Sequence, residues 1–212
     1  MYQPPHFRVE DHAALHAFIV AHPLGLLISN DGDKPVADLV PFHLDVEAGA
    51  RGRLRAHVAR ANPHWKLLQQ TGSALVVFQA SSHYISPSWY PSKAEHGKAV
   101  PTWNYAMVQV RGAAIVNEDA PWLREQVEAL TRSHEGGREH PWAVDDAPGE
   151  FIAAQLRAIV GFEIEIEEMN GKFKLSQNRP EADRASVVEA LSREGSAGVD
   201  TAAMMRAFGI GV

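Results

Sequence analysis

The chain has 212 residues, of which 45% are hydrophobic and 22% are charged, a composition typical of a soluble globular domain. No apolar run approaches the roughly 18 residues that cross a bilayer, and the polar N-terminus does not resemble a signal peptide, so we expect a cytoplasmic protein without a membrane partner. The absence of cysteine excludes disulfides and thiolate metal sites.

The net charge of −6 is unevenly distributed along the chain. Residues 48–117 contain eight basic residues and a single acid, Glu95, so this segment carries +7 and the rest carries −13. A basic segment in an acidic protein indicates a local anionic ligand rather than a surface that coats DNA. The alternative is a chance cluster of solvated arginines.

The first half of the sequence predicts two helices with short strands between them. Residues 10–21 have helical apolar spacing that stops before Pro23. Asn62 is expected to cap a second helix that ends at Gly72, with Pro63 at its first position. Strands are expected at residues 25–29, 40–46, 54–58 and 74–78.

The second half begins with an aromatic, proline-rich segment, residues 81–103, which cannot be regular throughout. Asn170-Gly171 predicts a two-residue hairpin turn, with residues 172–177 as the returning strand. The other expected elements are strands at residues 108–111 and 162–167, helices at residues 121–133 and 151–156, and two short helices after Pro180.

Six or seven strands joined mostly by short turns predict an α+β protein whose antiparallel sheet closes into a barrel, because closure hides the sheet edges. We expect the barrel domain to cover residues 1–180. A short helical extension, residues 181–212, is expected to pack on it.

The junction between the strand at residues 54–58 and the following helix is the best candidate for an anion site. Arg53, Arg55 and His57 share one face of the strand, and Arg60 and Asn62 follow at its end. A helix N-terminus offers unpaired N–H groups and a positive dipole end, and arginine adds charge-assisted hydrogen bonds. The alternative is that Asn62 only caps the helix.

The aromatic segment suggests a wall for a planar ligand. Trp89, Tyr90, Trp103 and Tyr105 supply ring faces, and Asn104 supplies a polar edge. The alternative is that these rings fill the core or a dimer interface. No group of residues has the spacing of a metal site, so we expect none.

These motifs occur in an order that resembles the PaiB-like FMN-binding negative transcriptional regulators. The matching segments span residues 1–190 and are His22-Pro23-Leu24-Gly25, residues 57–63, residues 84–90, residues 100–105, Ile159-Val160-Gly161-Phe162 and residues 174–178. The resemblance implies a split β-barrel of the kind found in pyridoxine phosphate oxidases and flavin reductases. It also implies a homodimer with FMN in clefts between the subunits.

The resemblance implies two groups of cofactor-binding residues. The FMN phosphate would be held at the strand–helix junction, where the oxidases carry a serine–arginine–lysine cluster; this chain has Asn62-Pro63-His64 there, so Arg60 or Lys66 would have to replace it. A C-terminal strand would reach the flavin. The residues implied are His57, Val58, Arg60, Asn62, Lys66, Trp103, Asn104, Lys174, Ser176 and Gln177.

Three functions are compatible with the sequence. The resemblance implies a flavoprotein that lowers gene expression, although the acidic charge and the missing helix-turn-helix do not favour direct DNA contact. A second possibility is an FMN-dependent oxidoreductase acting on a small planar or phosphorylated substrate, for which no catalytic residue can be named. The third is a ligand-free structural or degenerate member whose basic segment pairs with the acidic part of the chain across a dimer.

Overall fold

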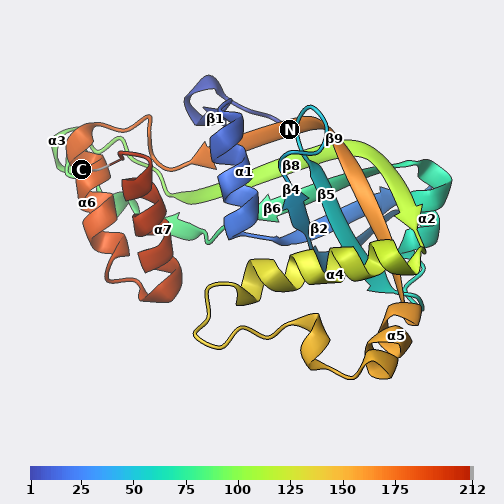
Figure 1. Cartoon of the computed structure of the whole chain (residues 1–212). Coiled ribbons are helices and arrows are strands. Elements are labelled where there is room, and N and C mark those ends of the chain that lie inside the picture. Colours follow the sequence, from blue (N-terminus) through green and yellow to red (C-terminus); the bar gives the residue numbers. More distant parts are fainter. Residues whose placement is uncertain (211–212) are drawn as a thin grey trace. The chain divides into compact units, whose positions relative to one another are not determined.

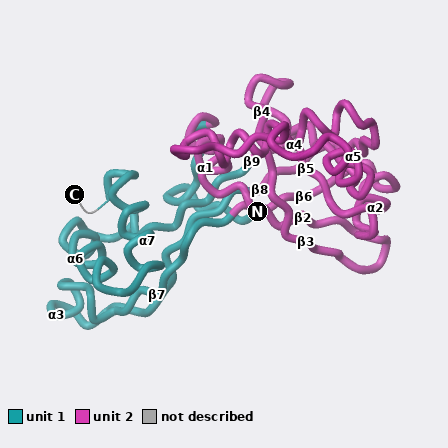
Figure 2. Tube along the Cα trace, turned by 60° about the horizontal axis from the view of Figure 1, so that its bottom comes forward, with its two compact units in different colours: residues 1–11, 79–108, 170–212 teal, residues 12–78, 109–169 magenta. Residues whose placement is uncertain are grey.

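The computed structural model describes residues 1–210, whose helices and strands (Figure 1) group into two units that Figure 2 colours separately. Unit 1 consists of Met1–Asp11, Gln79–Val108 and the chain from Asn170 onward, and unit 2 consists of His12–Phe78 and Gln109–Met169. The last two residues of the expected extension, 211 and 212, lie outside the described residues. The boundary expected at residue 180 stays a prediction.

Unit 2 holds most of a curled sheet with the strand order β3-β2-β6-β8-β9-β5-β4. Each paired register that is resolved in this unit is antiparallel, including Leu27 opposite Asp38 and His57 opposite Gly161. The α+β class and the antiparallel split barrel predicted from the sequence are confirmed. The strands are β2 (Leu24–Asn30), β3 (Pro35–Pro41), β4 (His43–Asp45), β5 (Arg53–Ala59), β6 (Ser73–Gln79), β8 (Thr102–Asn117) and β9 (Ile159–Lys174).

The core of unit 2 forms because alternate strand residues point to one face of the sheet. The Phe42 ring lies edge-on to Phe78 and Phe162, with centroids 5.6 and 6.0 Å away. Leu54 is fully buried between its exposed or half-buried neighbours along β5. The helices of this unit are α1 (His12–Ala21), α2 (His64–Thr71), α4 (Ala120–Glu135), α5 (Gly149–Arg157) and the 3-10 turn η3 (Val144–Asp146).

Unit 1 is built on the N-terminal half of β8 and the C-terminal end of β9. The helices α6 and α7 pack on each other there, and Val187, Leu191 and Met205 are completely buried. The remaining elements are η1 (Pro5–Phe7), β1 (Arg8–Val9), β7 (His83–Ile85), η2 (Pro87–Trp89), α3 (Ser92–His96), α6 (Glu181–Leu191) and α7 (Gly195–Ala207). The irregular segment expected at residues 81–103 therefore contains only short elements.

The structure corrects two expectations. Asn170-Gly171 makes no hairpin, because β9 runs without a break from Ile159 to Lys174 and Gly171 pairs with Val9 of β1. A type I′ turn needs positive φ at both central residues, and neither is among the positive-φ residues. The strand expected at residues 40–46 is divided at Phe42 into β3, which pairs with β2, and β4, which pairs with β5.

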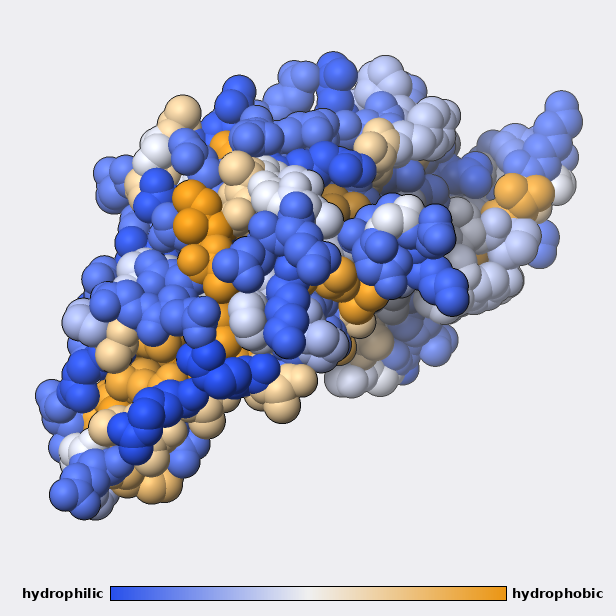
Figure 3. All heavy atoms as spheres, turned by 90° about the vertical axis from the view of Figure 1, so that its right-hand side faces the viewer, coloured by the Kyte–Doolittle hydropathy of each residue, from blue (hydrophilic) through white to orange (hydrophobic). Residues whose placement is uncertain are grey.

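No helix within residues 1–210 is long and apolar enough to cross a membrane. The face shown in Figure 3 is mostly hydrophilic, with hydrophobic residues in several separate places.

Candidate functional site

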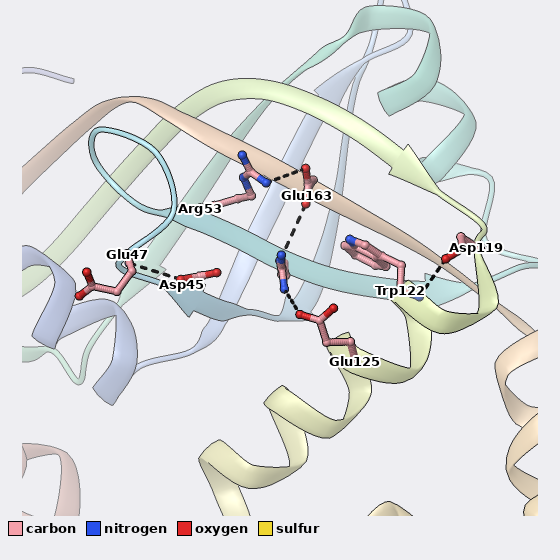
Figure 4. Close-up of polar contacts among 8 residues, drawn as sticks. Asp45, Glu47, Arg53, Asp119, Trp122, Glu125 and Glu163 are labelled. Carbon is pink, nitrogen blue, oxygen red and sulfur yellow. Dashed lines mark hydrogen bonds and ion pairs between the residues drawn. The ribbon is translucent and has the colours of Figure 1, made fainter.

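The positive charge on the basic face of β5 is partly compensated within unit 2. Arg53 pairs with Glu163 of β9 at 3.1 Å, and Arg55 pairs with Glu125 of α4 at 2.9 Å (Figure 4). Glu163 also lies 3.8 Å from the Nε atom of Arg55, which it faces across the β5–β9 ladder. The local excess of positive charge seen in the sequence is thus partly compensated by acids from distant segments.

Helix α4 lies over this face of the sheet and starts where the Asp119 side chain accepts a hydrogen bond from the Trp122 backbone N–H (Figure 4). The Trp122 ring fits closely over Gly161, where a Cβ atom would come within 2.2 Å of it. His57 donates through Nδ1 to Oε1 of Gln126, at 2.7 Å. His57 therefore faces the helix.

Arg60, at the end of β5, binds the chain's own oxygens. Its Nε donates to the carbonyl of Arg157 at 2.9 Å, and its Nη2 donates to the carbonyl of Ile159 at 3.0 Å. Its Nη1 also pairs with Glu118. The guanidinium thus ties the end of α5 to the start of β9.

The start of α2 is occupied by a carboxylate. Oδ2 of Asp38 accepts hydrogen bonds from Nδ1 of His64 at 2.8 Å and from Nδ2 of Asn62 at 3.2 Å. These hydrogen bonds, the one from His64 first, lower the pKa of Asp38. Helix α2 begins at His64, one residue later than expected, and its N-cap residue is therefore Pro63 rather than Asn62. The Asn62 side chain still accepts a hydrogen bond from the backbone N–H of His64. A carboxylate of the chain itself therefore lies where an anion was expected.

The two remaining junction residues differ in exposure. The Val58 side chain is in the core, at 6% exposure. Lys66 is exposed, and its Nζ lies 5.4 Å from the centre of the Trp65 ring. Among the charged residues predicted at this junction, Lys66 alone has no acidic partner within residues 1–210.

In unit 1, Lys174 and Trp103 come together. Lys174 donates through Nζ to Oγ1 of Thr102 at 2.5 Å and to the carbonyl of Trp103 at 2.6 Å. Burial lowers the pKa of Lys174, and the nearby charges of Lys172 and Arg179 lower it further. The Trp103 side chain is 54% exposed and therefore available to a ligand.

These two residues line a pocket of about 350 Å³, here called the aromatic–lysine pocket. Its rings and cations are Tyr2, Phe7, Trp103, Tyr105, Lys172 and Lys174. Nζ of Lys172 lies 5.5 Å from the centres of both the Tyr2 and the Tyr105 rings. A cavity with ring walls and two cations suits a planar anion.

Sequence reasoning missed part of this pocket. Lys172 lies two residues before Lys174 in the strand expected at residues 172–177, and this spacing places both side chains on one face, so the sequence held the signal for Lys172. No local signal could have placed the N-terminus here. The segment is fixed by the β1–β9 pairing and by Gln3, whose Nε2 donates to the Gly171 carbonyl at 2.8 Å.

The other predicted residues of unit 1 have internal partners. Asn104 is fully buried, and its Oδ1 accepts a hydrogen bond from Oγ of Ser176 at 3.1 Å. Ser176 has a φ of 69°, a left-handed conformation at the end of the strand. Gln177 caps its own turn, since its Oε1 accepts from the Leu175 N–H and its Nε2 donates to the Phe173 carbonyl. Their roles in cofactor binding stay predictions.

No group of three or more potential metal-ligating side chains occurs in the part of the chain that the structure describes.

Comparison with known proteins identifies the family of this chain. The model of the family described as "Putative FMN-binding domain" matches residues 1–168. The chain belongs to this family. The protease synthase and sporulation protein PAI 2 of Bacillus subtilis is 31% identical over 194 residues, covering 92% of this chain and 90% of that protein. The PaiB-like resemblance is thereby confirmed.

Solved structures support the fold. An FAD- and haem-binding protein from Mycobacterium smegmatis has a TM-score of 0.58 at 17% identity, covering 79% of this chain and 73% of its own. A flavocytochrome from Azotobacter vinelandii has a TM-score of 0.56 at 15% identity, covering 79% and 69%. At such identities, these likenesses show the shared fold alone.

Proposed function

We propose that this protein binds FMN and acts as a flavin-dependent negative regulator of gene expression. The match to the FMN-binding family over residues 1–168 carries the first part of the proposal. The regulatory part rests on the resemblance to the PaiB-like regulators. We also propose a homodimer, as that resemblance implies, and a cytoplasmic location, as expected from the composition.

The aromatic–lysine pocket supports a flavin ligand on physical grounds. Ring faces and cations are the groups that a planar, anionic cofactor requires, and the pocket contains Trp103 and Lys174, two of the cofactor residues that the resemblance implies. When bound, FMN would supply redox chemistry. The chain's own residues would bind it and set its surroundings.

Regulation without direct DNA contact is the version we favour. The C-terminal residues 181–210 carry only three arginines against five acids, and one of the arginines, Arg193, pairs with Glu189. DNA binding depends on cations that can neutralise phosphates. A gel-shift series at rising salt tests this version, and a shift that weakens steeply with salt would contradict it.

The visible absorption spectrum of the purified protein, before and after addition of FMN, tests cofactor binding. We expect flavin bands that stay with the protein through gel filtration. Protein that neither carries FMN nor retains it when added would refute the proposal.

An FMN-dependent oxidoreductase is the second candidate, favoured by the pocket, which could admit a small planar substrate next to a flavin. Rapid anaerobic bleaching of bound FMN by NADH or NADPH would support it. A flavin that neither reductant bleaches would favour the regulatory function.

A further inference from the structure

Unit 2 contains a pocket of about 320 Å³, here called the His43 pocket, whose lining includes none of the predicted cofactor residues. It lies where helix α1 and helix α4 both contact β4. Its polar groups are His43 of β4 and Ser133 and His134 of α4. The other lining residues are Ile19, Val20, Ala21, Pro23, Phe42 and Leu44, so most of the wall is apolar.

The hydrogen bonds around His43 fix which of its ring nitrogens carries the hydrogen. Nδ1 of His43 lies 3.1 Å from Oγ of Ser133. The single hydrogen of that hydroxyl is donated to the Ala129 carbonyl, at 2.9 Å. Nδ1 must therefore donate to Ser133, which leaves the lone pair of the neutral imidazole on Nε2. Because the hydroxyl accepts from the imidazole, Ser133 is not a nucleophile activated by His43.

The imidazole of His43 is neutral at neutral pH. Burial lowers its pKa most, the Asp45 carboxylate opposes this effect, and the positive charges of Arg55 and Arg132 lower the pKa further. Within residues 1–210, no group donates a hydrogen bond to Nε2. A half-buried acceptor without a donor therefore belongs to a mostly apolar wall.

These properties define a class of ligand. An anion would meet the lone pair of Nε2, and a cation would lose its hydration without meeting a carboxylate, since no Asp or Glu of the described chain lines the pocket. A neutral molecule with an O–H group would satisfy Nε2 and cover apolar surface such as Val20, which is 61% exposed. The volume is at the lower end of the range for small-molecule sites and corresponds to a single ring with short substituents.

We propose that the His43 pocket binds a small, uncharged, mostly apolar molecule with one acidic O–H group, in its simplest form a phenol, whose O–H donates to Nε2 of His43. Ser133 is a positioning residue, because it accepts from Nδ1 and thereby keeps the hydrogen off Nε2. A molecule bound there would touch α1, β4 and α4 together and stabilise their packing. The inference goes beyond the proposed function and does not depend on FMN.

The test compares 4-methylphenol with 4-methylanisole, which has a methoxy group in place of the O–H, by calorimetric titration of the purified protein. The wild type should bind the phenol about threefold to tenfold more tightly than the ether, the effect of one hydrogen bond. His43→Phe keeps a ring but removes the acceptor and should abolish this difference. His43→Gln, which still offers an amide oxygen, should retain part of it. The matched control is His140→Phe, which removes an exposed histidine outside the pocket and should behave like the wild type.

The ring nitrogens of His43 give an independent measurement. Nitrogen NMR of the free protein should show the hydrogen on Nδ1, and addition of the phenol should shift the Nε2 resonance. Circular dichroism should show that all variants are folded. A hydrogen on Nε2 in the wild type, equal affinities for the phenol and the ether, or binding of neither would each overturn the inference. Protein that does not retain FMN would refute the proposed function alone.

Discussion

Replacing Arg60 by methionine separates a structural from a cofactor-binding role for this residue. The variant loses two hydrogen bonds, to the carbonyls of Arg157 and Ile159, at 2.9 and 3.0 Å. The ion pair with Glu118 adds little, because both side chains are more than 40% exposed and water screens the pair. At about 1 kcal/mol for each hydrogen bond, unfolding should become easier by about 2 kcal/mol.

For a chain of this length, that loss corresponds to a fall in melting temperature of about 4–8 °C. Thermal unfolding followed by circular dichroism measures it, with Lys66→Met as the control that removes a charge but no hydrogen bond to a carbonyl. An unchanged melting temperature together with a tenfold weaker FMN affinity would refute this reasoning.

Three other substitutions test contacts in the two units. Gly112→Ala should largely prevent folding, because its Cβ would lie 1.7 Å from a backbone oxygen of the neighbouring strand; expression and gel filtration measure this, and a folded variant would contradict the close approach. Asp38→Asn should lower the melting temperature at neutral pH but not in strong acid. Hydrogen bonding from His64 lowers the pKa of Asp38 below its ordinary value of 3.8. The carboxylate therefore stabilises the fold fully above pH 3.8, and this stabilisation is lost as the pH falls through the lowered pKa. Equal effects at both pH values would count against it. Asp183→Ala should cost about 3 kcal/mol in chemical denaturation, because the buried carboxylate accepts hydrogen bonds from the backbone N–H and the hydroxyl of Ser92; a loss below about 1 kcal/mol would show that water replaces it.

Sequence patterns predicted an element correctly where residues close together in the sequence determine its structure. The alternation in β5 predicted its buried and exposed faces, and the helical spacing before Pro23 predicted α1 to within two residues at its start. The hairpin predicted at Asn170-Gly171 was wrong because residues far away in the sequence determine the structure there. Pairing of β9 with β1, a segment about 160 residues away in the chain, holds Gly171 in an extended strand and overrides a turn preference that depends on two residues.

The sequence by itself determined the fold class, the family resemblance and the location of the basic residues, because periodicity, composition and ordered motifs are properties of the chain. Only the tertiary structure decided which of those charges are compensated. Glu118, Glu125 and Glu163 reach the arginines of β5 and its end from later segments, and Asp38 reaches the start of α2 from an earlier one. Electrostatic interactions act through space, so an anion site cannot be located from the positions of cations along the chain alone.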